Sequence, residues 1–493
     1  MIDLGLLINL ALQYMSGKYV SKYEHICYAF FGFAVLFLMS SCGGGDSSSN
    51  PELMIDPPQL LLSDPVDGSK NLSDGDLTIV LTFDQNVTSP SFTHSLVTAG
   101  NATVILVSAA LKNVTIKLSS LQKGKTYELI VPKGVVLGPT KLEAPLVKIS
   151  FSIMDEVVYE PIVETLCTSD PLPQAKKVYD YLINAYGKKT LSASMANVNW
   201  NIAEAELVNK ATGKYPAIAF LDYIHLYASP ANWIDYSNTR VVENWWDKGG
   251  LIGASWHWVV PNVENGNEYT YKPGNGNKDN EGNWTTTFRA KNAIIEGTWE
   301  NRIMKADLEK IAGYLKLLKN KNIPVIWRPL HEAAGNLYEY SGGTAWFWWG
   351  YDGPEVYKKV WIYMFNYFKE QGVNNLIWVW TTQMRDADFY PGDEYVDIIS
   401  RDIYDQKTGA NNAEQYNLIV AKYSRKLIAL SECGNVAMIS AQWNAGAHWS
   451  FFMPWYRYNA TTLDGHEYAD TSWWKDAMEQ SFVVTRDQLP SMK

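Results

Sequence analysis

Tryptophan is absent from the first 199 residues of this 493-residue chain, and all 20 tryptophans lie at or after Trp200. Clusters of lysine and arginine are also absent, and the formal net charge is -10. Because a phosphate backbone is bound by such clusters, we do not expect nucleic acid as a partner. The chain is too long for one ordinary core. The uneven tryptophan content therefore predicts a boundary between a small domain and an aromatic-rich catalytic domain.

Cysteine is scarce as well. The four cysteines are Cys27, Cys42, Cys167 and Cys433. They have neither CxxC spacing nor the density of a disulfide scaffold, so they indicate no metal or redox site. No cofactor is expected. Long hydrophobic runs are also lacking, since the apolar stretch at 26–39 is too short for a membrane-spanning helix.

A leader precedes the folded part of the chain. Lys18 and Lys22 precede the apolar stretch, and small residues with Cys42 follow it. This pattern resembles a bacterial lipoprotein signal, which implies cleavage before Cys42 and a lipid on its thiol. We expect a signal peptide at 1–41, a Gly/Ser-rich flexible tether at 42–57, and a location at the cell envelope, lipid-anchored or secreted. Membrane contact would occur only through the lipid; an uncleaved signal anchor is the alternative.

Residues 58–155 predict a small all-β domain. Short segments with period-two alternation are separated by turn residues, which is typical of a β-sandwich. The strands are expected at 77–83, 103–107, 114–118, 127–131 and 147–151. The segments Asp64-Pro65-Val66-Asp67-Gly68 and Gly124-Lys125-Thr126-Tyr127 resemble those of bacterial Ig-like domains. Because the domain contains no tryptophan, a spacer role is favoured over sugar binding.

Residues 156–493 alternate between helical and short apolar strand patterns. Helices are expected at 178–185, 304–320 and 355–371. Eight strands are expected at 190–194, 216–222, 250–255, 324–327, 375–380, 396–399, 427–430 and 449–453. Eight strands, each followed by a helix, predict a (β/α)₈ TIM barrel, whose functional groups gather at the carboxyl ends of the strands.

Two glutamates follow two of these apolar strands. Glu332 ends the segment that begins at Ile326, and Glu432 ends the segment that begins at Lys426. These positions follow the fourth and seventh predicted strands. A single glutamate at a strand end is more often part of a salt bridge, but a pair is what retaining glycoside hydrolysis requires. The sequence alone does not assign the acid and the nucleophile.

Further polar and aromatic residues flank the pair. The Tyr404 hydroxyl could donate to Glu432 and hold it ionised, or the residue could be a half-buried barrel tyrosine. Arg328 could be a fixed cation beside the carboxylates, although surface arginine is more common. The remaining candidates could bind sugar hydroxyls or stack on sugar faces, against a default of structural packing: His257, His331, Trp346 and Trp455.

Several motifs in order along the barrel resemble glycoside hydrolase family 26, chiefly its bacterial β-mannanases. These are Thr212-Gly213-Lys214-Tyr215-Pro216, Asp222-Tyr223, Trp256-His257-Trp258, Arg328-Pro329-Leu330-His331-Glu332, Trp346-Phe347-Trp348-Trp349-Gly350, Tyr390-Pro391-Gly392-Asp393, Arg401-Asp402-Ile403-Tyr404 and Ser431-Glu432. The resemblance implies that Glu332 is the general acid/base and Glu432 the nucleophile. It also implies that Arg328 and Asp402 support the carboxylates. The residues that it implies around the cleaved sugar are His257, His331, Trp346, Tyr404 and Trp455.

The expected activity is retaining hydrolysis of internal β-1,4-mannosidic bonds in mannan, galactomannan or glucomannan. A β-glucanase or β-xylanase of the same family and a non-catalytic surface glycan-binding protein are the alternatives. The stretch 333–345 is longer than the family pattern and should reshape one end of the cleft, which leaves endo against exo attack open. The Asn/Gly-rich stretch 261–284 is interpreted as a solvated loop rather than a calcium loop.

Overall fold

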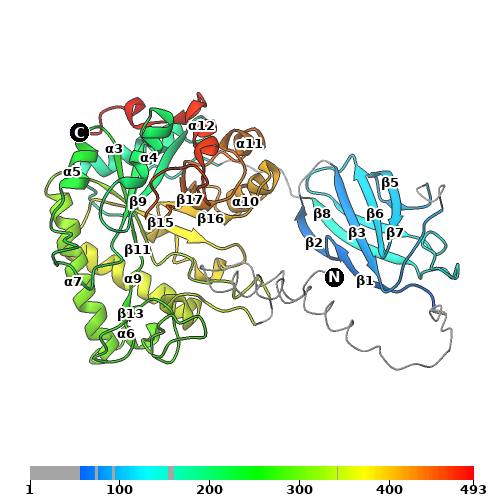
Figure 1. Cartoon of the computed structure of the whole chain (residues 1–493), viewed down its shortest axis with the longest axis horizontal. Coiled ribbons are helices and arrows are strands. Elements are labelled where there is room, and N and C mark those ends of the chain that lie inside the picture. Colours follow the sequence, from blue (N-terminus) through cyan, green and yellow to red (C-terminus); the bar gives the residue numbers. More distant parts are fainter. Residues whose placement is uncertain (1–55, 73–75, 91–94, 154–159, 341) are drawn as a thin grey trace, which may run out of the picture.

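The computed structural model describes two folded parts of the chain (Figure 1). The residues described are 56–72, 76–90, 95–153, 160–340 and 342–493. The predicted signal peptide at 1–41 and nearly all of the predicted tether lie outside them. Among the described residues, no helix is both long and apolar enough to cross a membrane.

The first folded part is the predicted β-sandwich. One four-stranded sheet has the order β1 (Leu60–Asp64), β3 (Leu77–Phe83), β6 (Asn113–Ser119) and β5 (Thr103–Ala110). The other has the order β2 (Ser69–Leu72), β8 (Val147–Ile153), β7 (Thr126–Val131) and β4 (Thr98–Ala99). Alternate residues of β3, β6, β7 and β8 are buried in one shared core, so all five predicted strands are confirmed.

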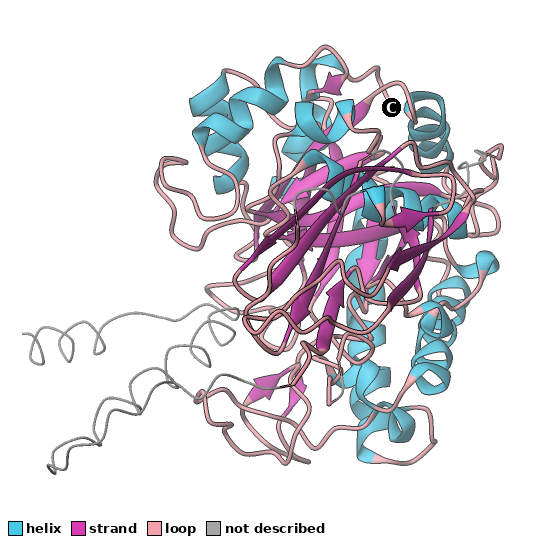
Figure 2. Ribbon diagram, turned by 90° about the vertical axis from the view of Figure 1, so that its right-hand side faces the viewer, coloured by secondary structure: helices cyan, strands magenta, loops and turns pink. Residues whose placement is uncertain are grey.

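The second part is the predicted barrel. Eight parallel strands close into a ring because β9 pairs with both β18 and β10. The strands are β9 (Thr190–Asn197), β10 (Ile218–Asp222), β11 (Leu251–Trp256), β14 (Val325–Pro329), β15 (Leu376–Thr382), β16 (Ile398–Tyr404), β17 (Leu427–Gly434) and β18 (Phe451–Pro454). A two-residue strand, β19 (Val483–Val484), also pairs with β9. Figure 2 shows the strands with helices packed around them.

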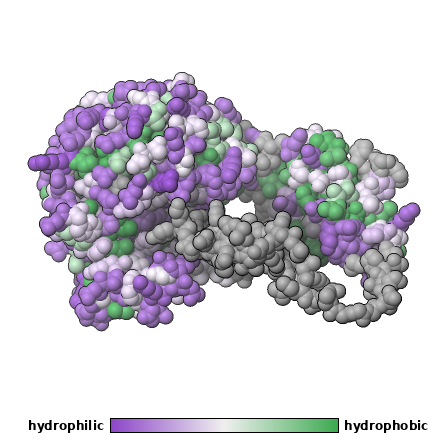
Figure 3. Space-filling view, viewed as in Figure 1, coloured by the Kyte–Doolittle hydropathy of each residue, from purple (hydrophilic) through white to green (hydrophobic). Residues whose placement is uncertain are grey.

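Helices cover the outside of the barrel. They are α3 (Pro173–Ala185), α4 (Ala203–Thr212), α5 (Arg240–Asp247), α6 (Ala290–Ala293), α7 (Trp299–Lys319), α8 (Trp348–Tyr351), α9 (Pro354–Glu370), α10 (Gly409–Lys422), α11 (Ile439–Asn444) and α12 (Thr471–Glu479). The face of this part that Figure 3 shows is mainly hydrophilic, with small separate hydrophobic areas. The α7 helix begins five residues before the predicted start, where the Thr298 side chain accepts from the backbone N–H of Asn301 at 3.1 Å and caps the helix.

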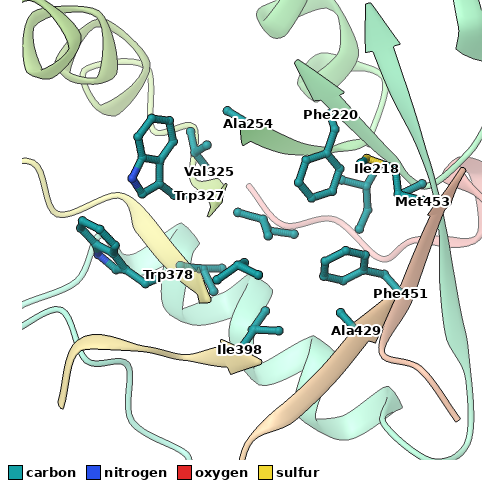
Figure 4. Close-up of a cluster of buried hydrophobic side chains, with 14 of the residues drawn as sticks. Ile218, Phe220, Ala254, Val325, Trp327, Trp378, Ile398, Ala429, Phe451 and Met453 are labelled. Carbon is teal, nitrogen blue, oxygen red and sulfur yellow. The ribbon is translucent and has the colours of Figure 1, made fainter. Parts of the chain in front are cut away.

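Side chains from several strands around the barrel pack together in its core (Figure 4). The rings of Phe220 and Phe451 meet with centroids 5.6 Å apart. Gly253 on the neighbouring strand leaves room for this contact, because a Cβ at that position would lie 2.5 Å from the Phe220 ring. Trp327 and Trp378 lie on the outer side instead, where both rings contact Phe368 of α9. Buried polar side chains such as Arg328 and Glu432 lie toward the carboxyl ends of their strands.

One connection differs from the prediction of a helix after every strand. Residues 383–397, between β15 and β16, form only two short 3₁₀ helices, η2 (Ala387–Phe389) and η3 (Asp393–Tyr395). Pro391 and Gly392, whose φ is +118°, interrupt any longer helix. The rings of Tyr390 and Tyr423 cover Trp380 on the outer side of β15, at 5.1 and 6.0 Å. Aromatic side chains therefore cover the barrel wall at this position.

Candidate active site

Glu332 lies in a sharp turn that follows β14. Leu330 and Glu332 both have left-handed backbone conformations, with φ of 47° and 49°. Such conformations cost roughly 1–3 kcal/mol each, so surrounding contacts must hold them. The Tyr357 hydroxyl donates to the Leu330 carbonyl at 3.0 Å, and the Trp349 indole N–H donates to the His331 carbonyl at 2.9 Å. Helices α9 and α8 thereby fix the turn from behind, while Glu332 itself stays half-exposed.

Glu432 lies inside β17 and is part of a buried hydrogen-bond network. Arg328 reaches it from β14, and the guanidinium Nη1 donates to Glu432 Oε1 at 2.6 Å. The Tyr404 hydroxyl of β16 donates to the other oxygen, Oε2, at 3.0 Å. Arg328 is 0% exposed and Glu432 is 6% exposed. Both carboxylate oxygens of Glu432 are therefore held in fixed positions by donors.

Asp402 completes this network on the neighbouring strand. A register shift between Arg401 and Asp402 brings Asp402 opposite Glu432. The second guanidinium nitrogen of Arg328, Nη2, donates to Asp402, and the Ser431 hydroxyl donates to the same carboxylate at 2.6 Å. Arg328 therefore balances two buried carboxylates at once, which is the condition under which a buried arginine is tolerated.

Burial and neighbouring charges act against each other at Glu432. Burial raises the pKa of the Glu432 carboxyl above its ordinary value, and the charge of Arg328 acts in the opposite direction. Burial and the charges of Glu432, Asp402 and Glu332 raise the pKa of Tyr404 well above its ordinary value, so Tyr404 stays a neutral donor. The charges of both glutamates raise the pKa of Tyr404, so both carboxyl groups lie near this side chain.

Two histidines lie beside the network, with ring centroids 4.3 Å apart. Burial lowers the pKa of His257, but the carboxylates of Asp222 and Glu432 outweigh burial and raise it. Asp222 bonds to His257 Nδ1 and also accepts from its backbone N–H at 3.2 Å. Burial and the charges of Arg328 and His257 lower the pKa of His331 well below its ordinary value. One ring is thus charged or shares a proton with Asp222, and the other is neutral.

Aromatic rings surround the histidines. The half-buried Trp455 has its ring centroid 5.7 Å from that of His257, and the Phe347 ring lies 5.2 Å from that of His331. Trp346 is half-buried directly before Phe347 in the connection from β14 to α8. The other eight predicted site residues lie in or directly after β11, β14, β16, β17 and β18.

Three of these residues could in principle ligate a metal. Ligand atoms of His257, His331 and Glu432 lie within 4.8 Å of one another. Arg328 donates to Glu432 in the same place, so a divalent cation there would meet a fixed positive charge. The donor set therefore suits neutral hydroxyl groups better than a metal.

The two loops noted in the sequence have defined structures. In the stretch 333–345, the Tyr338 hydroxyl donates to Asp388, which ties this loop to η2 after β15. In the stretch 261–284, β13 (Tyr269–Thr270) pairs with β12 (Val260–Pro261). Tyr271, the next residue, is packed against the site, because its ring lies 6.0 Å from that of His257. Tyr271 is 36% exposed, so the stretch is solvated there, as interpreted from the sequence, and its ring also borders the site.

Sequence reasoning missed three residues of the site. Tyr271 and Phe347 line the histidines, and Asp222 orients His257 from the end of β10. Asp222 had a usable signal, since it is an acidic residue that ends a buried strand. Tyr271 gave none, because its loop contains no hydrophobic periodicity.

Two stretches of the chain match known protein families. Residues 167–488 match glycosyl hydrolase family 26, and residues 55–152 match the bacterial Ig-like domain. A mannan endo-1,4-β-mannosidase B from Piromyces sp. is 34% identical over 340 residues, which cover 66% of this chain and 54% of that relative. A mannan endo-1,4-β-mannosidase from Bacillus subtilis strain 168 is 30% identical over 58% of this chain and 78% of its own length. The chain thus spans about half the length of the first curated relatives that it matches.

Solved structures of family 26 enzymes are also similar to this chain. The family 26 domain of an endo-β-mannanase/endo-β-glucanase from Prevotella bryantii is 40% identical, with a TM-score of 0.60, over 66% of this chain and 99% of that domain. A β-mannanase from a symbiotic protist of the termite Reticulitermes speratus, complexed with gluco-manno-oligosaccharide, is 33% identical with a TM-score of 0.57. The match covers 67% of this chain and 99% of that structure.

Proposed function

Because the chain belongs to glycosyl hydrolase family 26, we propose that its barrel hydrolyses internal β-1,4-mannosidic bonds with retention of configuration. The relatives described above are named for that activity, which supports mannan, galactomannan or glucomannan as the substrate. The observation that carries the proposal is the unequal surroundings of Glu332 and Glu432. Retaining hydrolysis needs one carboxyl that exchanges protons and one that stays ionised and fixed.

Glu432 is the nucleophile in this proposal. Arg328 and Tyr404 donate to its two oxygens and aim the carboxylate while they favour its charged form. Attack on the anomeric carbon forms a glycosyl-enzyme ester as the bond to the departing oxygen breaks. The charge on Glu432 is neutralised in this step, so the Arg328 charge must remain balanced by Asp402.

Glu332 is the general acid and then the general base. Its half-exposed position allows it to protonate the departing sugar oxygen and afterwards to take a proton from the water that hydrolyses the ester. A retaining pair requires a separation of about 5 to 5.5 Å between the two carboxyl groups. His257, His331, Trp346 and Trp455 then contact the sugar whose bond is cleaved, and no cofactor takes part.

Hydrolysis assays test the proposal directly. The purified chain and its Glu432→Ala variant would be incubated with linear mannan, galactomannan, lichenan and xylan, and reducing ends and product lengths followed. Release of short manno-oligosaccharides by the wild-type protein alone supports the proposal. Release of products from lichenan or xylan instead would indicate a β-glucanase or a β-xylanase. Binding without release from any glycan would indicate a glycan-binding protein.

We also propose that the mature protein begins at Cys42, carries a lipid on that thiol, and resides at the cell envelope with the Ig-like domain as a spacer. The support is the sequence pattern around Cys42 and the lack of tryptophan in the Ig-like domain. Metabolic labelling with a tagged fatty acid should mark the wild-type protein but not Cys42→Ala. Equal labelling of both, or of neither, would reject the anchor.

A further inference from the structure

Exposed leucines are confined to the Ig-like domain. Among the described residues, no leucine of the barrel part at 160–493 is exposed, whereas several leucines of the Ig-like domain are. These are Leu61, Leu62, Leu96, Leu106, Leu111, Leu142 and Leu146, with exposed fractions from 37% at Leu142 to 77% at Leu111. Single exposed leucines are common on protein surfaces, but a group of them at one place indicates a binding surface.

All of these leucines except Leu106 lie at one end of the sandwich. In the first sheet, Leu62 of β1 is level with Thr82 near the end of β3, and Thr82 is level with Asn113 at the start of β6. Leu111 lies at the tip of the hairpin that joins β5 to β6, and its carbonyl accepts from the Val87 backbone N–H at 2.7 Å. The start of β1 and the hairpin tip are therefore at the same end of this sheet.

The second sheet adds the connection from β7 to β8 to this end. Leu142 and Leu146 belong to that connection, and its Gly138 lies against Pro58, where a Cβ would be 3.1 Å from the Pro58 ring. Leu96 directly precedes β4, whose first residue pairs with the end of β7. We call this group of exposed side chains the leucine end of the domain: Leu61, Leu62, Leu96, Leu111, Leu142 and Leu146.

The chain enters the Ig-like domain at the leucine end. The Gln85 side chain donates to the Asp56 carbonyl at 2.9 Å, which fixes the entering segment beside the hairpin tip. Strand β8 runs away from this end, and the Ile153 backbone N–H donates to the Lys125 carbonyl at 2.9 Å, before the start of β7. The chain therefore enters at the leucine end and leaves at the opposite end.

The proposed membrane attachment lies just upstream of the leucine end. Fourteen residues lead from Cys42 to Asp56, and even a fully extended chain of that length spans at most about 50 Å. An uncleaved signal anchor, the alternative to the lipid, would also end before this stretch. Both kinds of attachment keep the bilayer within reach of the leucine end and away from the end where the chain leaves.

Lysines stand beside two of the exposed leucines. Lys112 follows Leu111, Lys141 precedes Leu142, and both lysine side chains are exposed. A leucine next to a lysine suits the membrane interface, because the apolar side chain enters the acyl region while the amine meets the headgroups. The buried core of a protein–protein interface is instead depleted of lysine. The composition of these loops therefore favours a lipid surface over a protein partner.

We infer that the leucine end binds a lipid bilayer, with Leu111 and Leu142 inserted at the level where headgroups meet acyl chains. The inference rests on the proposed attachment at Cys42, which brings the bilayer to this end. The acidic Glu143 beside Leu142 is paired with Lys133 at 3.6 Å. The membrane contact then includes protein side chains as well as the lipid. The two contacts together hold the domain in one orientation on the membrane.

Vesicle binding by the unlipidated chain tests the inference. The chain from residue 43 onward would be floated with vesicles of phosphatidylcholine, and of phosphatidylethanolamine with phosphatidylglycerol. It should bind both, and the anionic vesicles more strongly. Leu111→Asn, which suits the left-handed φ of 53° at that position, would be combined with Leu142→Ser. This double variant should lower the partition coefficient about tenfold or more on both compositions.

Ile105→Thr with Leu106→Thr is the matched control, because it removes two exposed aliphatic side chains of β5 outside the leucine end. It should bind vesicles as the wild-type chain does. Equal binding by all three proteins, or no binding by the wild-type chain, would overturn the inference. Circular dichroism and mannan hydrolysis should be the same in all three, because neither pair of changes touches a core or the barrel.

Two further measurements separate this inference from its neighbours. If sedimentation velocity shows a wild-type dimer that the Leu111→Asn/Leu142→Ser variant loses, the leucine end joins two copies of the chain, and membrane binding is overturned. Fatty-acid labelling at Cys42 tests the attachment independently. A labelled protein whose unlipidated form ignores vesicles would overturn the inference alone. Leucine-dependent vesicle binding by a chain that is never labelled would overturn the lipid anchor alone.

Discussion

Glu432 lies within β17, where every residue from Leu427 to Gly434 is buried, whereas Glu332 lies in a turn three residues beyond β14 and is half-exposed. At β17, side chains hold the carboxylate itself, through Arg328 and Tyr404. At β14, side chains from the helices behind hold the backbone carbonyls of the turn. The two glutamates thus show different contacts: donors reach the carboxylate of Glu432, and donors reach the backbone carbonyls directly before Glu332.

This difference corresponds to the chemistry that each position can perform. Two donors orient the Glu432 carboxylate and favour its charged form. Its burial among them keeps it from exchanging protons readily with water. A carboxyl on a rigid backbone with a half-exposed side chain can take and give protons. The two histidines repeat the contrast on a smaller scale, since Asp222 grips His257 whereas His331 Nδ1 is buried without a hydrogen-bond partner.

Exchanging each glutamate for its amide is expected to give the largest effects. Glu432→Gln should lower kcat on mannan by roughly 10⁴- to 10⁶-fold, because the covalent intermediate can no longer form. Glu332→Gln should also be severe on mannan. It should retain the first step on an aryl β-mannoside with a good leaving group, which needs no acid. Stopped-flow release of the phenol would then show a burst followed by slow turnover.

Mass spectrometry supplies the control for this pair. A glycosyl-enzyme should accumulate on Glu332→Gln, with the added mass on the peptide that contains Glu432. Circular dichroism would check that both variants remain folded. A burst in Glu432→Gln and none in Glu332→Gln would reverse the roles assigned to the two strand ends.

Arg328→Met should give the next largest effect, because it removes the positive charge that balances Glu432 and Asp402. Two buried carboxylates would lose their partner, at an expected cost of about 3–5 kcal/mol in the free energy of unfolding. Burial and Asp402 raise the pKa of Glu432 and Arg328 opposes them, so the variant should have a higher Glu432 pKa. Since attack needs the ionised form, the acidic limb of the kcat/KM profile should move to higher pH.

Arg328→Lys is the matched control for this change. It keeps the charge but loses the planar pair of donors that reaches Glu432 and Asp402 together. Its acidic limb should move less than that of Arg328→Met, although its activity also falls. If the limb stays in place in Arg328→Met, burial and not Arg328 governs the charge of Glu432.

The parts of this architecture that follow from local pattern could be predicted from the sequence. Most of the eight strands are apolar runs in the sequence, and Glu332 and Glu432 each follow such a run, at β14 and in β17. The absent helix between β15 and β16 was missed, although Pro391 and Gly392 were a visible signal. The prediction of one helix per strand came from the fold and not from those residues.

The contacts that separate the two glutamates could not be predicted in the same way. Arg328 and Glu432 are 104 residues apart in the chain, and Tyr357 reaches the Leu330 carbonyl from a helix 27 residues later. Such pairs depend on strand register and helix placement, which no short window of sequence encodes. The bulge at Asp402, which brings that carboxylate opposite Glu432, is a further example.

Tyr404→Phe removes one hydroxyl at the β17 end and should have an intermediate effect. A hydrogen bond to a charged group contributes about 1.5–3 kcal/mol, so kcat/KM on mannan should fall roughly tenfold to a hundredfold. Tyr468→Phe is the control, because its ring packs on that of Tyr404 at 5.9 Å. Its activity should stay close to wild type. Equal losses in the two variants would mean that packing, and not the donated bond, supports Glu432.

Tyr357→Phe makes the same chemical change at the β14 end and should have the smallest effect on rate. It leaves the buried Leu330 carbonyl without that donor, at an expected cost of about 1–3 kcal/mol in the free energy of unfolding. kcat should fall only a few-fold, because Trp349 still holds the His331 carbonyl and the Glu332 side chain is untouched. Denaturant unfolding and mannan hydrolysis would be measured together. A loss of kcat as large as that of Tyr404→Phe, with unfolding unchanged, would mean that this hydrogen bond positions Glu332 as strictly as the direct donors position Glu432.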